Sequence, residues 1–424
     1  MISRFTASSS NFDIGILRFA ASIFKSLYVV DSNLTVVYLC VMVYSIHMTQ
    51  RSYKYRIYPT DSQKKQLAID FGCARWVFNH ALSMRQKAYQ RRGESMNSIA
   101  LSRHITALKK TTRYGWLKDA ASTVITQKLR DMDTAYRNFF TGRAKFPNFK
   151  RKNHAQSVRY QLDQRIIDTT YSPGKLLKLT GLGEINVVWS RIPSGKPKMA
   201  TVSKDATGKH WVSMSIEELI LPMPKTKKSV GIDIGIKDVI VTSDGQFSGA
   251  PKYTKQYAKQ LRAEQKSLSR KKKGSVRWHK QRVIVARVHA KIANSRKDFL
   301  HKLTTGLVRD YDFIGIEDLN VSGMLKNRCL SKAVADVGMF ELKRQLEYKC
   351  AWYGKQLVQI SRWAPTTKAC SSCGQVHDMP LSKRIMNCGC GLELDRDWNA
   401  AINVLKSAGN VGRGVESSGL KAVA

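Results

Sequence analysis

The sequence predicts an α/β chain built from several domains, and three features of its 424 residues support that prediction. From Val230 onward, short apolar runs typical of buried strands alternate with helical stretches. Upstream, a helix-rich segment covers residues 61–140 and a strand-rich segment covers residues 155–220. The length allows two or three domains with their own cores, and a hydrophobic content of 43% is typical of globular chains.

The composition departs from a globular average in its charge. The chain carries 72 Lys and Arg residues against 31 Asp and Glu, a formal net charge of +41, and a chain this basic repels itself unless it binds a polyanion. The positive residues are spread along the chain, as expected for contact with a long nucleic acid. A membrane-surface protein would concentrate them on one amphipathic helix, and a ribosomal protein is usually much smaller. We therefore expect nucleic acid as the partner, with no small-molecule substrate and no membrane.

Residues 1–47 are expected to be an upstream extension rather than a domain. Residues 13–47 are apolar, but the densest run, 34–46, is short for a membrane span, and Asp31 interrupts the sequence before it. The segment also lacks a good secretory signal and cleavage site. A basic segment with the character of an ordered domain begins at Met48, so a start codon assigned too far upstream would explain the extension. A membrane anchor is the alternative.

A strand followed by a long amphipathic helix is predicted at the start of the basic region. Residues 53–57 alternate apolar or aromatic with basic side chains, as a half-exposed strand does. Residues 59–61, Pro-Thr-Asp, end that strand and cap a helix. Apolar residues then recur at intervals of three and four and define one helical face: Leu67, Phe71, Ala74, Val77, Phe78, Ala81 and Leu82. Further helix is expected to about residue 140.

The segment after these helices is predicted to form a small antiparallel β unit. It begins with a basic loop, residues 142–152, that carries two phenylalanines. Short alternating runs separated by Gly and Pro follow at residues 178–180, 185–189 and 210–216. The strand at 53–58 could join this unit, which would make the helices of 61–140 an insertion into it.

The C-terminal half is predicted to contain a second sheet with helices around it. A strand and turn are expected at 230–235, and further strands at 239–242, 313–317 and 357–361. Helices are expected at about 253–309, at about 336–354 and from Asp397 onward. The first of these helical stretches is strongly basic. The residues after about 408 are small and rich in Gly and Ser, and are expected to be flexible.

Three acidic residues of this half stand where a carboxylate is unusual. Asp233 lies in the strand-like sequence from Gly231 to Gly235, Glu317 ends an apolar strand, and Asp397 opens the last helix. A carboxylate among strand-forming residues is costly to bury unless it is paired or metal-bound. The two glycines would let a backbone or a nucleic acid approach closely. An RNase H-type fold would bring the three acids together, to hold two Mg²⁺ ions for phosphodiester hydrolysis without a protein nucleophile.

Each of these acids also has an ordinary structural explanation. An Asp in a turn between strands, as at Asp233, is common. Glu317 could end a strand or cap a helix, and Asp397 could be an N-cap or a first-turn acid favoured by the helix dipole. Their order, spacing and contexts taken together favour the catalytic interpretation. Asp238 and Asp395, their near neighbours, are interpreted as acids that support the site or face solvent.

Four of the eight cysteines cluster late in the chain, as Cys370-x2-Cys373 and Cys388-x-Cys390, with a Gly after each pair. The spacing is typical of a zinc ribbon, and the Gly permits a turn whose amides point at sulfur. Two unrelated thiol pairs are the alternative. The C-x-C half is less usual, so His377 could replace one ligand. Four thiolates leave no open coordination position, which predicts a structural zinc just before the last helix.

Together these motifs resemble those of the TnpB proteins of bacterial insertion sequences, which look like the ancestors of type V CRISPR effectors. The resemblance rests on Gly-Ile-Asp-Ile-Gly-Ile-Lys at 231–237, Ile-Glu-Asp-Leu-Asn at 316–320, the cysteine pairs, and Asp-Arg-Asp-Trp-Asn-Ala-Ala at 395–401. It extends from about Met48 to Ile402 and does not cover the upstream extension. The last of these motifs is the most specific.

The resemblance implies a domain order. It implies a RuvC-like nuclease domain of the RNase H type at 226–365 and 391–407, interrupted by a zinc ribbon at 366–390. It also implies a wedge β-barrel at 48–60 and 141–225, with a helical recognition insertion at 61–140. Residues 408–424 would be a flexible tail.

The same resemblance implies a transposon-encoded, RNA-guided DNA endonuclease. Asp233, Glu317 and Asp397 would be its catalytic residues and hold magnesium, and the four clustered cysteines would hold zinc. The partners would be a guide RNA transcribed from the end of the element and double-stranded target DNA beside a short motif. Base pairing would read the sequence. The expected location is the cytoplasm and nucleoid of a bacterium or archaeon.

Candidate nucleic-acid contacts follow from charge and not from any base-reading signal. They are Arg75, Lys145, Lys150, Arg151, Lys152, Arg270, Lys271 and Lys272. A solvated helix could carry such charge without binding anything. Two alternatives to the nuclease are a nuclease-inactive RNA-guided DNA-binding regulator and an accessory DNA-binding protein of transposition. Regulators of that kind resemble this family but lose one or more of the acids, whereas all three are present here.

Overall fold

The protein is described from a computed structural model that covers residues 48–153, 155–162, 176–193, 195, 197, 199–380 and 382–418, with side chains from 49 to 410. The upstream extension and the membrane-anchor alternative, both assigned to residues 1–47, lie outside the described residues. Within the described part of the chain, no helix has the length and apolar character to cross a membrane.

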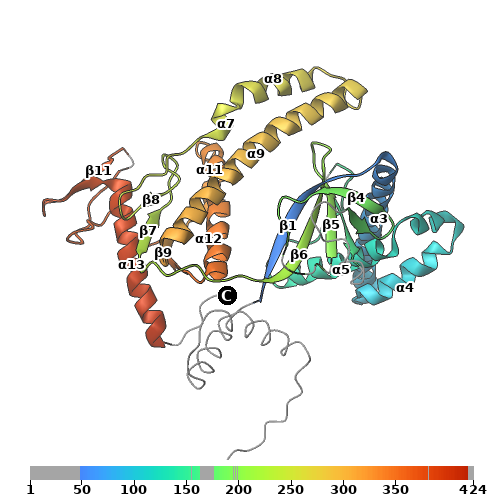
Figure 1. Ribbon diagram of the computed structural model, residues 1–424, viewed down its shortest axis with the longest axis horizontal. Coiled ribbons are helices and arrows are strands. Elements are labelled where there is room, and N and C mark those ends of the chain that lie inside the picture. Colours follow the sequence, from blue (N-terminus) through green and yellow to red (C-terminus); the bar gives the residue numbers. More distant parts are fainter. Residues whose placement is uncertain are drawn as a thin grey trace, which may run out of the picture. The chain divides into compact units, whose positions relative to one another are not determined.

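An antiparallel sheet of six strands combines one strand from before the helical segment with five from after it (Figure 1). The strands are β1 (Met48–Tyr58), β2 (Gln156–Gln161), β3 (Leu177–Leu179), β4 (Gly183–Val188), β5 (Met199–Lys204) and β6 (His210–Leu219), in the order β2-β5-β6-β1-β4-β3. The predicted antiparallel β unit is therefore confirmed, and β1 joins it by pairing with β4. The sequence did not reveal β2 and β5, because each is only six residues long and at least half polar.

Burial alternates along β1 as its sequence predicts. Tyr53, Tyr55 and Ile57 are buried in the core of this sheet, whereas Lys54 is exposed. Thr60 then caps the next helix, since its side chain accepts a hydrogen bond from the backbone N–H of Gln63 while the Gln63 side chain accepts one from the Thr60 N–H. This reciprocal capping box fixes where the strand ends and the helix begins.

The helical segment consists of α3 (Asp61–Arg92), α4 (Ser98–Lys109), the 3-10 helix η1 (Thr112–Asp119) and α5 (Ser122–Phe140). All seven residues of the predicted apolar face of α3 are buried. The basic loop at 142–152 has no helix or strand, as predicted. It is anchored to α3, because the Asn79 side chain accepts from the Lys150 N–H at 2.7 Å and donates to the Lys150 carbonyl at 2.9 Å.

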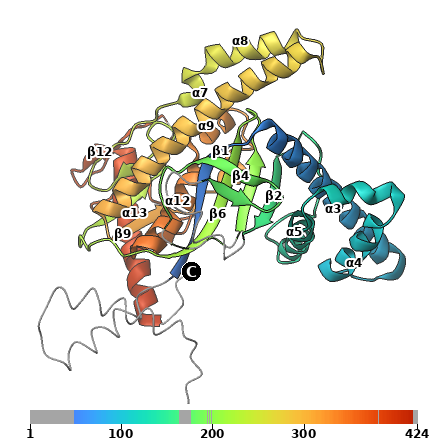
Figure 2. The same cartoon turned by 45° about the vertical axis from the view of Figure 1, so that its right-hand side comes forward.

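The second sheet has four strands in the order β10-β9-β7-β8. They are β7 (Ser229–Asp233), β8 (Val241–Thr242), β9 (Phe313–Glu317) and β10 (Gln356–Ile360), with β7, β9 and β10 parallel and β8 antiparallel at the edge. Helices α9 (Val276–Asp310) and α12 (Met339–Tyr353) pack on one face and α13 (Arg396–Ser418) on the other (Figures 1 and 2). The α/β class predicted from the sequence is confirmed.

Two predicted segments differ in the structure. The basic stretch at 253–309 is divided into α7 (Tyr253–Gln256), α8 (Ala258–Ser269) and α9, and α8 folds back on α9 as a hairpin (Figure 2). The turn between them, residues 270–275, contains Gly274 at a φ of 88° and ends at Ser275, which caps α9. The residues from 408 onward, expected to be a flexible tail, continue α13 as far as Ser418. The short helices α10 (Val321–Met324) and α11 (Ser331–Val337) complete this half.

A pair of glycines sets how closely α13 approaches the second sheet. Gly231 of β7 and Gly315 of β9 lie opposite each other in the strand register. A Cβ atom on Gly231 would lie 2.2 Å from the Ala401 carbonyl oxygen, and one on Gly315 would lie 2.7 Å from the Ala408 Cβ. The helix backbone therefore rests on the sheet backbone, which only residues without a side chain permit.

Gly231→Ala is expected to lower the free energy of unfolding by about 1–3 kcal/mol, because the new methyl group meets helix backbone that cannot rotate away. Denaturant unfolding measures this change. Gly306→Ala is the matched control, since Gly306 lies in α9 with no atom within 4 Å of the added Cβ, and helix propensity predicts a gain of about 1 kcal/mol there. Equal effects of the two substitutions would contradict the close-approach argument.

Candidate functional site

Two of the predicted acids stand at the ends of adjacent parallel strands. Ile232 of β7 lies opposite Ile316 of β9, so Asp233 and Glu317 occupy the next position on each strand. Both isoleucines are buried in the core with α9 and α12. Because side chains alternate along a strand, Asp233 and Glu317 turn to the opposite face, the one that α13 covers.

The third acid enters this face from the first turn of α13. Asp397 is preceded by Asp395, whose carboxylate accepts from the backbone N–H of Asp397 at 2.9 Å and of Trp398 at 3.3 Å. Asp395 is therefore the residue that caps the helix, which leaves the Asp397 side chain free of that role. The indole N–H of Trp398 donates to the Ser243 carbonyl at 3.0 Å and so ties the helix start to the turn after β8.

The three carboxylates are close enough to affect one another. Burial raises the pKa of Asp233 from its ordinary 3.8 to about 7, and the negative charges of Glu317 and Asp397 add to the shift, while Arg396 opposes it. Crowded like charges of this kind are typical of a site that binds cations.

Other side chains hold two of the three acids in place. Arg396 contacts one oxygen of Asp397 at 3.3 Å and Arg384 contacts the other at 3.7 Å. The Thr366 hydroxyl donates to Glu317. The ligand atoms of the four clustered cysteines all lie within 4.8 Å of one another. Among the described residues, the three acids do not form a group as tight as this one.

The four clustered cysteines come together as their spacing predicts. The sulfurs of Cys370 and Cys390 are 3.7 Å apart, and those of Cys373 and Cys388 are 3.5 Å apart. A tetrahedral zinc with bonds of about 2.3 Å requires sulfur separations of about 3.8 Å, so these residues fit the ion. The glycines after each pair, Gly374 and Gly391, both have positive φ, at 80° and 92°.

The second pair lies in the turn of a small hairpin, β11 (Ile385–Asn387) and β12 (Glu393–Asp395). A backbone hydrogen bond at Leu392 is the main cause that lowers the pKa of the Cys390 thiol to about 6, which favours the thiolate that a metal needs. His377 places its Nε2 3.2 Å from the Cys388 sulfur. All four ligand positions are filled without His377, so its predicted substitution for a cysteine is not required.

Hydrogen bonds link the cysteine segment to the helix that carries Asp397. Asn399, fully buried on α13, accepts from the Ser371 N–H and donates to the Ala369 carbonyl, both at 2.8 Å. Asn403, one turn further on, donates to the carbonyls of Thr366 and Ala369. Thr366, Asn399 and Asn403 are not among the site residues predicted from the sequence. The spacing of two asparagines four residues apart on the buried side of a helix was the available signal.

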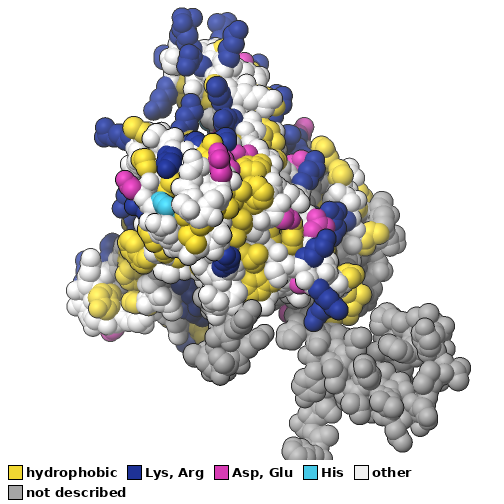
Figure 3. All heavy atoms as spheres, turned by 90° about the vertical axis from the view of Figure 1, so that its left-hand side faces the viewer, with side chains coloured by type: hydrophobic (Ala, Val, Ile, Leu, Met, Phe, Trp, Pro, Cys, Tyr) yellow, Lys and Arg dark blue, Asp and Glu magenta, His cyan; other side chains and the backbone are white. Residues whose placement is uncertain are grey.

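The candidate nucleic-acid contacts fall into two groups. Lys145, Arg151, Lys152, Arg270 and Lys272 are exposed, and Lys and Arg side chains gather on the α8–α9 hairpin at the top of Figure 3. Arg75 is partly exposed beside Trp76 and Trp116 in a cavity of about 510 Å³. Lys150 and Lys271 are engaged within the chain: the Lys150 ammonium lies 4.2 Å from the centre of the Phe78 ring, and Lys271 donates to Ser267.

Three family models match the chain. One described as "Probable transposase" matches residues 210–328, one described as "Cas12f1-like, TNB domain" matches 340–404, and one described as "Helix-turn-helix domain" matches 48–94. In this structure residues 48–94 contain β1 and the single long helix α3. The second match covers the cysteine cluster and Asp397.

Relatives match over most of their length. A protein of Streptomyces pristinaespiralis named "Putative RNA-guided DNA endonuclease" is 41% identical, and the match covers 85% of this chain and 90% of that protein. "Putative RNA-guided DNA endonuclease InsQ" of Escherichia coli strain K12 is 32% identical, with 84% and 91% covered. Among solved structures, a Cas12f1–sgRNA–target DNA complex matches 84% of this chain and 98% of that chain at 11% identity and a TM-score of 0.47.

Asp233→Asn is expected to raise the melting temperature of the metal-free protein by a few degrees at about pH 8. The folded state holds the Asp233 proton up to about pH 7, whereas an unfolded Asp loses it near 3.8, so the wild-type protein loses stability as the pH rises through this window. The Asn variant lacks the charge, and its advantage should shrink toward pH 4. Thermal unfolding in EDTA across this range measures the effect. Equal melting temperatures at pH 8 would mean that neither burial nor the neighbouring acids destabilise the charged Asp233 carboxylate.

Proposed function

Since the chain belongs to the TnpB family of insertion-sequence proteins, we propose that it is a transposon-encoded RNA-guided DNA endonuclease with a RuvC-type Asp/Glu/Asp site. Residues 226–365 and 391–407 would form the nuclease domain around the cysteine ribbon at 366–390. Residues 48–60 and 141–225 would form the wedge domain and 61–140 the recognition insertion. The convergence of Asp233, Glu317 and Asp397 from two strand ends and a helix start is the observation that supports this proposal most directly.

The donor set suits magnesium. Three carboxylates without Cys or His offer the hard oxygen ligands that Mg²⁺ prefers. A pair of ions about 3.5–4 Å apart needs ligands spread over more space than a single ion does. The three carboxylates form a looser group than the four cysteines, as such a pair of ions would require. When bound, the ions supply an activated water and stabilise the leaving oxygen of the phosphodiester.

The residues of the chain prepare this site in three ways. Asp233 would give up its proton to a bound cation, because the positive charge would offset the burial and the neighbouring carboxylates that together raise its pKa. Thr366 orients Glu317, and Arg384 and Arg396 hold the Asp397 carboxylate. Those arginines partly neutralise the acids before any ion is present.

The cysteine ribbon has a structural role in this proposal. Four sulfurs close a tetrahedron and leave no position for substrate. The ribbon is joined to α13 through Asn399 and Asn403 and to Glu317 through Thr366. Zinc would therefore fix the positions of two catalytic carboxylates without taking part in the reaction.

A guide RNA from the element end and a target DNA duplex are the proposed partners. The net charge of +41 matches a long polyanion. The exposed lysines and arginines of the 142–152 loop and of the α8–α9 turn are the proposed phosphate contacts. Base pairing would select the target, so the protein needs to contact mainly backbone and shape.

The protein purified with its native flanking RNA should cut a plasmid that carries the matching target, in Mg²⁺ and not in EDTA. Asp233→Ala, Glu317→Ala and Asp397→Ala should each lower the cleavage rate by about 10³-fold or more, the scale of removing an electrostatic element from an active site. Asp378→Ala is the matched control because the Asp378 side chain is 94% exposed. It should cleave at the wild-type rate.

RNA-dependent DNA binding without cleavage would instead identify a nuclease-inactive regulator, and DNA binding that ignores the RNA would identify an accessory protein of transposition. Cleavage that survives all three alanine substitutions would move the active site elsewhere.

The purified chain should contain about one zinc per molecule by elemental analysis, the content of a single four-thiolate site. Cys390→Ser should lose that zinc and lower the melting temperature, since the ribbon and the start of α13 share hydrogen bonds. Cys329→Ser, at an exposed cysteine outside the cluster, should change neither. Full zinc content in the Cys390 variant would contradict the assignment of four cysteine ligands.

A further inference from the structure

One tryptophan beside the carboxylate site lies almost entirely in solvent. Trp363 is 86% exposed, whereas Trp116, the next most exposed of the eight tryptophans, is 40% exposed. A large aromatic side chain gains little from water and usually packs against another surface. An exposed Trp close to a functional site therefore indicates a contact that forms with a partner.

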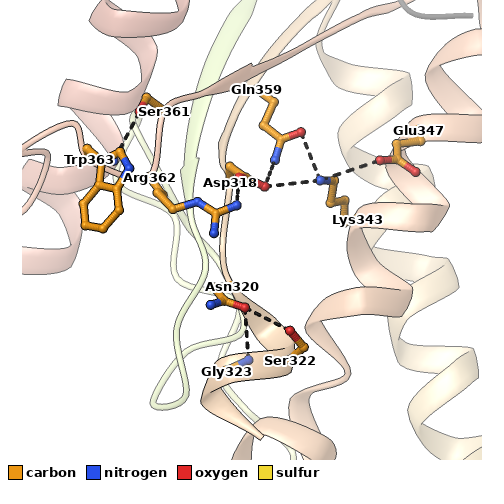
Figure 4. A network of polar contacts seen from close by, with 10 residues as sticks. All are labelled: Asp318, Asn320, Ser322, Gly323, Lys343, Glu347, Gln359, Ser361, Arg362 and Trp363. Carbon is orange, nitrogen blue, oxygen red and sulfur yellow. Dashed lines mark hydrogen bonds and ion pairs between the residues drawn. The ribbon is translucent and has the colours of Figure 1, made fainter. Parts of the chain in front are cut away.

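The backbone that carries Trp363 is fixed rather than loose. The turn at residues 361–366 follows β10 directly. Within it, the Trp363 N–H donates to the Ser361 hydroxyl at 3.3 Å (Figure 4). The Ala364 N–H donates to the Ser361 carbonyl at 3.1 Å. The Thr366 N–H donates to the Ala364 carbonyl at 2.8 Å. The exposed ring thus projects from an ordered corner.

Both ends of this turn are connected to the strand end that bears Glu317. On one side, the Arg362 guanidinium pairs with Asp318, the residue after Glu317, and Figure 4 shows Arg362 between Trp363 and Asp318. The Asp318 N–H also donates to the Ile360 carbonyl at 3.2 Å. On the other side, the Thr366 hydroxyl donates to Glu317 itself. The position of the Trp363 ring is thereby coupled to the position of a proposed catalytic carboxylate.

We propose that Trp363 is a stacking platform for a base of the DNA strand that enters the carboxylate site. This inference rests on the proposed nuclease function and adds a substrate-binding residue to it. Every base presents a flat face, so stacking on an aromatic ring tolerates any sequence, as a nuclease guided by RNA requires. The exposed Lys368 lies on the segment that follows Trp363 and suits a phosphate of that strand.

Stacking would act on substrate position rather than on the chemistry. A base held on the Trp363 ring limits how far the neighbouring phosphates can slide past Asp233 and Glu317. Loss of the ring should therefore raise the concentration of strand needed for cleavage more than it lowers the rate at saturation. A purely structural tryptophan would lower the amount of folded protein and leave that concentration unchanged.

The test compares Trp363→Leu, which keeps apolar bulk without an aromatic face, with Trp363→Phe, which keeps the face. Phe340→Ala is the matched control because Phe340 is another exposed aromatic, on α12. Each change is made in the full chain carrying Asp233→Asn and bound to its guide RNA. Binding of a fluorescent single-stranded oligothymidylate is measured by anisotropy, and quenching of tryptophan emission by the unlabelled strand is recorded alongside.

Trp363→Leu should weaken strand binding about tenfold, the scale of one stacked base, while Trp363→Phe stays within about threefold and Phe340→Ala matches the parent. Quenching should fall in both Trp363 variants and not in Phe340→Ala. In the cleaving protein, Trp363→Leu should raise the apparent KM for single strand more than it lowers kcat.

Unchanged binding and unchanged quenching in Trp363→Leu would overturn the proposal. The same conclusion follows if that variant loses only thermal stability or self-association, because the ring would then contact protein. The binding and quenching measurements need no cleavage, so they separate failure of the stacking proposal from failure of the nuclease proposal, which the plasmid assay tests independently.

Discussion

The contact between α13 and the backbone of the second sheet is the constraint on which the candidate site depends. Gly231 and Gly315 remove the side chains that would otherwise hold the helix away, so helix backbone meets strand backbone. Asp233 and Glu317 follow these glycines by two positions and therefore face the same way. A carboxylate in the first turn of α13 then arrives beside two carboxylates at the strand ends, although Asp397 lies 80 residues or more from either in the sequence.

Close approach alone would not orient the side chains, and the cysteine ribbon supplies that orientation. Asn399 and Asn403 hold the ribbon against α13, Asp395 caps the helix, and Thr366 reaches Glu317 from the same segment. In the sequence, the ribbon lies between β10, the strand beside Glu317, and α13, the helix that bears Asp397. Four sulfurs that fit a zinc ion therefore lie in the segment that positions Glu317 and the start of α13.

Positive and negative side chains have different distributions. The positive residues spread over the helices between β1 and β2, the 142–152 loop and the α8–α9 hairpin, whereas Asp233, Glu317 and Asp397 meet where β7 and β9 end. Some cations contact the protein itself instead: Lys150 lies against Phe78, Lys271 donates from the α8–α9 turn to Ser267 of α8, and Arg396 pairs with Asp397. A formal charge of +41 thus overstates the charge that a nucleic acid would meet.

The sequence by itself determined the features that depend on local periodicity and spacing. Strand alternation at 53–57, the apolar face of α3, the capping Thr60 and the cysteine pairs all express short-range rules, and the structure contains each of them. Only the tertiary structure decided what joins distant segments: β1 pairing with β4, the break that makes α8 and α9 a hairpin, Thr366 on Glu317, and Trp363 left in solvent. These contacts depend on which segments of backbone lie next to each other in space, and the local pattern of residues along the sequence does not specify that arrangement.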